Sequence, residues 1–125
     1  MRLGTFLVIV GAVGILFGLG GLIAPELMAS TYGVMDPTAA QLLSERFLGA
    51  ELLGVGLISL LSRNLTGASV RPLVTGSLIG NAAGFVVALM AMFNKVMSAT
   101  GWSTVVIYLV FALGFAYFYF TRKTD

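Results

Sequence analysis

The residues best suited to chemistry lie in one short stretch, residues 44–51. This stretch carries three ionisable side chains, Glu45, Arg46 and Glu51, among mostly apolar neighbours. Each of them costs at least about 2.5 kcal/mol at the centre of a bilayer if it is unpaired, so such residues usually face a partner or a water-filled cavity. The stretch therefore predicts a polar layer inside a membrane helix.

The kinds of chemistry are limited because the chain has no cysteine and no histidine. Disulfides, thiolate nucleophiles and iron–sulfur ligation are excluded, and the usual ligands of zinc, copper and haem are missing. The commonest general base is missing too. We therefore expect no metal site, no cofactor and no catalytic residue, and we favour a non-enzymatic protein.

Two further polar residues lie at a depth similar to that of Glu51. At 1.5 Å per residue from one end of the spans, Glu51 lies about 16 Å deep, Asn81 about 14 Å and Tyr108 about 20 Å. These three side chains are expected to meet near the midplane. Glu45 and Arg46 lie nearer the opposite end, at the level of Ser103 and Thr104, and form a second possible polar layer with them. Glu51 points about 140° away from Arg46 around the helix, so it needs a partner on another helix or a proton.

Three hypotheses explain these residues. In the first, they pair with helix ends, loops or other polar side chains and fix the register of the helices. In the second, they line a polar pocket, open toward the outer face, for a lipid head group, a quinone or a small amphiphile. The third hypothesis, proton-coupled transport, predicts an activity that disappears in Glu51→Gln.

The composition indicates that membrane helices position these residues. Of the 125 residues, 58% are hydrophobic and 10% are charged, whereas soluble domains carry about 25% charged residues. Asp36 is expected to cap the second helix and Pro37 to begin it. The apolar stretches predict one membrane domain, residues 1–125, with an all-α fold of four transmembrane helices. The expected spans are about residues 3–23, 37–62, 72–93 and 102–120.

The basic residues predict the orientation of these spans. One side of a four-span arrangement carries Arg2, Arg63, Arg71, Arg122 and Lys123. The other side carries Lys95 with the acidic Glu26 and Asp36. Because Lys and Arg concentrate on the cytoplasmic side, both termini are predicted to be cytoplasmic. The basic residues form no cluster with interleaved aromatics, so nucleic acid is not an expected partner.

Small residues indicate where membrane helices can approach each other closely. The first span has Gly4, Gly11 and Gly18 on one strip and Gly14 and Gly21 on the next. The third span has Gly76, Gly80, Gly84 and Ala88 at four-residue spacing. These faces either hold the helices of one chain together or contact a second copy or a larger membrane complex.

The last span ends in a run of aromatic residues. Its members are Phe111, Phe115, Tyr117, Phe118, Tyr119 and Phe120. Aromatic side chains at this level usually form an interfacial belt. The alternative is a ring-lined groove for a lipid, quinone or pigment tail.

Several short motifs carry a resemblance to known proteins. They are Tyr32-Gly33-Val34, Arg46-Phe47-Leu48-Gly49-Ala50, Leu53-Gly54 with Leu57, and Gly101-Trp102. The chain thereby resembles a group of small bacterial four-helix membrane proteins and, more distantly, the DoxX-like group. The resemblance implies a bacterial inner membrane and an association with quinone-linked or thiol-linked redox complexes. A chain without cysteine is not expected to have a thiol role, and no catalytic residue is carried over.

The leading functional hypothesis is an accessory or assembly subunit, which acts as a homo-oligomer or within a larger membrane complex and contacts membrane lipids. Minimal loops, paired small-residue faces and the absence of catalytic side chains favour it. The alternative is a lipid- or quinone-binding protein that uses Glu45, Arg46, Glu51, Asn81 and Tyr108.

Overall fold

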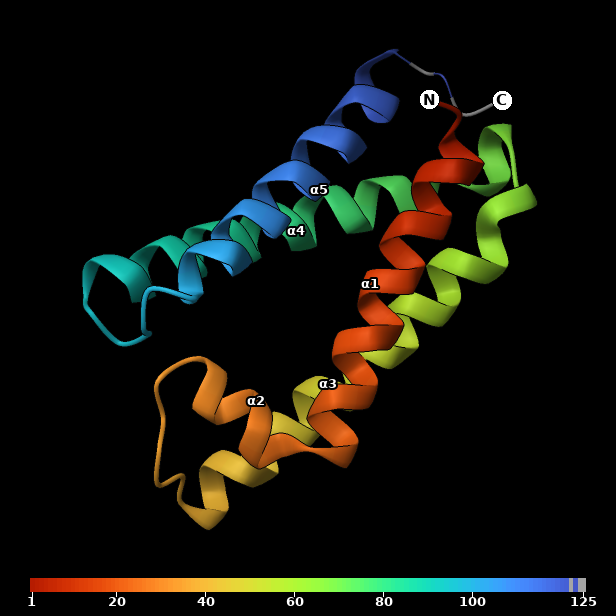
Figure 1. Cartoon of the computed structure of the whole chain (residues 1–125). Coiled ribbons are helices and arrows are strands. Elements are labelled where there is room, and N and C mark those ends of the chain that lie inside the picture. Colours follow the sequence, from red (N-terminus) through yellow and green to blue (C-terminus); the bar gives the residue numbers. More distant parts are fainter. Residues whose placement is uncertain (122, 124–125) are drawn as a thin grey trace.

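The structure, a computed structural model, describes residues 1–121 and 123. These residues form an all-α fold (Figure 1). The helices are α1 (Leu3–Ile23), α2 (Pro25–Thr31), α3 (Ala39–Leu61), α4 (Arg71–Phe93) and α5 (Gly101–Thr121). Two 3₁₀ turns, Ser62–Asn64 and Gly67–Ser69, connect α3 to α4.

Three helical segments are long and apolar enough to cross a membrane. They are Leu3–Ile23, Gly67–Phe93 and Gly101–Thr121. The described residues therefore indicate a multi-pass membrane protein, as the composition predicts. The fourth long helix, α3, has 23 residues but also contains the three ionisable side chains.

The start of α3 differs from the predicted start at Asp36 and Pro37. The helix begins at Ala39, and Thr38 is its cap. Thr38 Oγ1 accepts a hydrogen bond from Gln41 N at 3.2 Å, and Gln41 Oε1 accepts one from Thr38 N at 2.8 Å. This reciprocal capping box satisfies two backbone donors, which a single aspartate cap two residues earlier does not do.

The long helices are arranged in two pairs, α1 with α3 and α4 with α5. The two pairs diverge from the end of the molecule where α1 begins and α5 ends (Figure 1). Glycines of α1 bring α1 and α3 into backbone contact. A Cβ atom on Gly14 would lie 2.9 Å from Gly56 Cα, and one on Gly18 would lie 2.5 Å from Leu53 N. The glycine face of α1 therefore serves packing within the chain.

The glycines of α4 have different surroundings. A side chain on Gly84 would overlap the ring of Tyr108 on α5, so the absence of a side chain here allows α4 and α5 to pack closely. Gly76 and Gly80 are exposed, and apart from the adjacent backbone of α4 no described atom lies within 4 Å of a Cβ placed on either one. Only part of the expected small-residue face of α4 therefore packs against another helix of the chain.

The two pairs meet in an apolar core near the start of α1 and the end of α5. Its buried members are Leu3, Phe6, Leu7, Val10, Val70, Val74, Phe115 and Phe118. The ring centroid of Phe6 lies 4.9 Å from that of Phe115 and 5.5 Å from that of Phe118. Gly114 makes room for the Phe6 ring, because a side chain there would overlap it.

This core changes the interpretation of the aromatic run in α5. Phe115 and Phe118 were expected in an interfacial belt, but their exposed fractions are 0% and 3%. Tyr117 and Phe120 remain exposed, as a belt requires. The run is therefore divided between core and surface by the helical period of α5.

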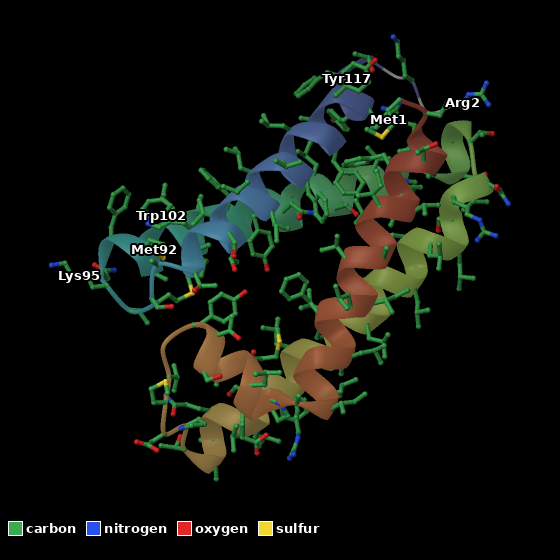
Figure 2. All side chains as sticks on the ribbon, viewed as in Figure 1. Met1, Arg2, Met92, Lys95, Trp102 and Tyr117 are labelled. Carbon is green, nitrogen blue, oxygen red and sulfur yellow. The ribbon has the colours of Figure 1, made fainter. Side chains whose placement is uncertain are left out.

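Two arginines mark one end of the molecule. Arg2 and Arg63 line one shallow hollow beside the apolar core, and we call this end the basic end. Figure 2 shows Arg2 and Tyr117 at this end and Lys95 and Trp102 at the far end of α4 and α5. We call the opposite end, where α2 lies, the α2 end. Arg122, which also enters the predicted orientation, lies outside the described residues.

Candidate functional site

A cleft of about 580 Å³ lies between the two helix pairs. Its walls are mostly apolar and include Val10, Phe17, Leu48, Leu52, Ile107 and Phe111. Its polar side chains are Tyr32, Gln41, Ser44, Glu45, Asn81, Thr104 and Tyr108. Ligand sites in proteins are usually concave, mostly apolar and 300–1,000 Å³ in volume, with a few polar groups that orient the ligand. The cleft has this character.

Glu45 enters the cleft because of its position on α3. Gln41, Ser44 and Leu48 lie four, one and three residues from it, which places all four residues on one side of the helix. Glu45 is half-buried. Among the described lining residues it is the one ionisable acid or base apart from the two tyrosines.

The other two ionisable residues of α3 do not reach the cleft. Arg46 and Glu51 are exposed, and neither belongs to the cleft lining. At 100° per residue, Arg46 points about 160° away from Leu48, on the far side of α3, whereas Glu51 points about 60° away from Leu48, beyond the edge of the cleft lining. The expected meeting of Glu51 with Asn81 and Tyr108 is therefore not what the structure shows.

Asn81 on α4 and Tyr108 on α5 both line the cleft. Asn81 Nδ2 donates a hydrogen bond to Ser77 O at 2.7 Å, which leaves the amide oxygen to face other groups. The Tyr108 ring packs over Gly84. This wall of the cleft faces Glu45 on α3, so the cleft joins three of the five predicted polar residues.

At the α2 end of the cleft, hydrogen bonds join the end of α2 to the α4–α5 pair. Tyr32 Oη and Thr104 Oγ1 lie 2.8 Å apart. Ser98 N donates to Tyr32 O at 2.9 Å, and Ser98 Oγ donates to Thr31 O at 3.2 Å. We call these three hydrogen bonds the clasp. They tie the end of α2 to the α4–α5 connection.

Gly33 allows the chain to turn directly after the clasp. Its φ of +93° is a conformation that residues with a side chain rarely adopt. A Cβ atom at this position would also lie 3.0 Å from Ser98 Cβ. The glycine in the Tyr32-Gly33-Val34 motif therefore has a local structural explanation.

Three polar lining residues, Tyr32, Gln41 and Ser44, were not predicted as site residues, whereas Thr104 was expected in a second polar layer with Glu45. Gln41 and Ser44 could have been found from the helical spacing around Glu45. Depth alone places Thr104 at the level of Glu45. Nothing in the sequence pattern indicates that Tyr32, on a separate short segment, contacts α5.

The described residues contain no group of three or more His, Cys, Asp or Glu side chains that could hold a metal ion. Comparison of the chain with protein-family models, with curated proteins and with solved structures gave no match.

Proposed function

We propose that this protein binds a membrane amphiphile, a lipid or quinone, in the cleft between its two helix pairs. One observation carries the proposal: a 580 Å³ apolar cleft with a small set of polar groups, among them Glu45, Asn81 and Tyr108. An apolar cavity with few, convergent polar groups is the usual form of a site for such ligands.

The order of residues along the cleft supports one direction for the ligand. Glu45 lies about 9 Å from the first residue of α3, and Val55 lies about 15 Å further along the helix. The polar head would contact Glu45 and Gln41 near the α2 end. The apolar tail would extend toward Val10, Val55 and Phe111.

We also propose that α3 spans the membrane with the other three long helices, and that both termini are cytoplasmic. The close backbone contact of α1 with α3 supports this, since α1 is itself long and apolar enough to span. Arg2, Arg63 and Arg71 at the basic end support the orientation. The α2 end would then face outward, in a bacterial inner membrane.

The experiment compares two tryptophan variants of neighbouring residues on α5. Ile107 lines the cleft, whereas Val106 is exposed and lies outside it. We expect Ile107→Trp to fill the cleft and lose the co-purifying amphiphile, and Val106→Trp to retain it. Native mass spectrometry of protein extracted from its own membranes in a mild detergent measures the bound fraction. Wild-type protein without any bound amphiphile, or equal retention by both variants, would contradict the proposal.

An accessory or assembly subunit is the second candidate. The open space beside Gly76 and Gly80 favours it, because exposed glycines on a membrane helix allow another helix to approach closely. The same mass spectra test it. A protein companion that is lost in Gly80→Leu supports this function, and a chain without any protein companion removes it.

A further inference from the structure

The outward face of α3 carries an apolar seam with the spacing of a helix–helix interface. Its members are Leu43, Phe47, Ala50, Gly54, Leu57 and Leu61, separated alternately by four and three residues. The exposed fractions of Leu43, Phe47 and Leu61 are 53%, 65% and 73%. No described atom lies within 4 Å of a Cβ placed on Gly54. Residues with this alternation occupy the a and d positions of a coiled coil.

Arg46 and Glu51 lie on either side of this seam. With Phe47 and Gly54 at a positions and Ala50 at a d position, Arg46 occupies a g position and Glu51 the following e position. Both side chains are exposed. They point about 140° apart around the helix, so they cannot pair with each other in one copy of α3.

The depth of these charges makes their exposure costly. Glu51 is about 18 Å from the first residue of α3, near the middle of the proposed span. A charged side chain at that depth is expensive in contact with lipid, and it usually faces a partner. The described chain turns Arg46 and Glu51 outward, which points to a partner outside the chain.

We propose that α3 forms the interface of a parallel homodimer, in which Arg46 of each copy pairs with Glu51 of the other. Two copies with the same orientation in the membrane have parallel α3 helices related by a two-fold axis. In a parallel coiled coil, a g residue of one helix lies beside the e residue five positions further along the other helix. Arg46 and Glu51 have this separation, and the symmetry forms the pair twice.

A second copy fits this surface better than lipid or an unrelated helix. The face is self-complementary, since it presents a positive and a negative group on opposite sides of one seam. Ala50 and Gly54 in the middle of the seam allow the two backbones to approach closely. The pairing also explains how a helix with three ionisable residues can remain in the membrane beside more apolar helices.

Disulfide cross-linking tests the surface directly, because the natural chain has no cysteine. Ala50→Cys places one thiol at the seam, in an otherwise unchanged protein in its own membrane. We expect oxidation to give a covalent dimer. Gly80→Cys, on the exposed face of α4, is the matched control and should remain monomeric. Absence of the Ala50→Cys dimer, or efficient cross-linking through Gly80→Cys instead, overturns the proposal.

Charge exchange in the Ala50→Cys background tests the ion pairs. Arg46→Glu or Glu51→Arg alone juxtaposes like charges and should reduce the dimer fraction at least about tenfold. The double variant restores opposite charges and should restore cross-linking. If a reversed charge prevents membrane insertion, the neutral variants Arg46→Gln and Glu51→Gln replace the charge-reversed ones. They should give a smaller reduction in the dimer fraction. Unchanged cross-linking in all single variants, or no recovery in the double variant, overturns the pairing.

Discussion

Glu45 and Glu51 are six positions apart on α3, yet their environments differ. Glu45 is half-buried beside Gln41 and Ser44 in the cleft, whereas Glu51 is exposed on the outward side. The difference follows from the helical rotation between the two positions. At the scale of single residues, the polar stretch of α3 therefore divides into a carboxyl group that lines the cleft and a surface charge.

The role of Glu45 can be tested by removing its charge while its shape is preserved. We expect Glu45→Gln to lower the retention of the co-purifying amphiphile about threefold to tenfold, because a hydrogen bond to a charged group is replaced by a neutral one. Glu26→Gln is the control, since Glu26 is an exposed carboxyl group on α2 and is not part of the cleft lining. The bound fraction in native mass spectra is the measurement. Equal retention in both variants would remove Glu45 from the proposed head-group site.

At the scale of elements, α3 has three sides with different surroundings: α1, the cleft and the outside of the molecule. Gly49 and Gly56 contact α1, Glu45 and Leu52 line the cleft, and Phe47 with its seam faces outward. The contact with α1 is made by backbone atoms. Inside a membrane, the hydrophobic effect does not drive two helices together. Close packing must therefore stabilise the α1–α3 pair.

This dependence on close packing predicts opposite effects of one substitution at two glycines. Gly18→Ala places a methyl group 2.5 Å from Leu53 N, so the helices must separate. We expect a loss of about 1–3 kcal/mol in the free energy of unfolding, as for overpacked cores. Gly76→Ala adds a methyl group in open space and should be neutral or stabilising by up to about 1 kcal/mol, because alanine favours a helix. Unfolding in mixed detergent micelles measures both, and equal effects would contradict this account.

Sequence patterns could predict the elements well because long apolar stretches alternate with short polar or proline-containing segments. The first helix has the predicted bounds, and α3, α4 and α5 begin or end within two residues of prediction. The helical spacing also separates Glu45 from Glu51. The neighbours of each helix could not be predicted, because small residues indicate a contact face but not which helix packs against it. Gly18 and Gly80 look alike in the sequence, but only Gly18 packs against another helix of the chain.

At the scale of the whole molecule, different interactions join the two helix pairs at the two ends. The basic end is joined by buried apolar side chains such as Phe6 and Phe115, and the α2 end by the polar clasp. Between these ends the pairs are separated by the cleft. An apolar cleft has little tendency to collapse in a bilayer, because lipid tails solvate its walls as well as protein does. The cleft is thus compatible with a stable membrane fold.

The clasp should therefore control the width of the cleft at the α2 end. Tyr32→Phe removes the hydrogen bond between Tyr32 and Thr104, while the ring remains. We expect a longer and broader distance distribution between spin labels on Leu27→Cys and Trp102→Cys, two exposed positions on α2 and α5. Tyr117→Phe, an exposed tyrosine near the basic end, is the control and should leave the distribution unchanged.

An unchanged distribution in Tyr32→Phe would mean that the backbone hydrogen bond of Ser98 is sufficient to hold the two pairs together. If the distribution is broader and the bound amphiphile is also released faster, the ligand leaves the cleft at the α2 end, where the clasp must break first.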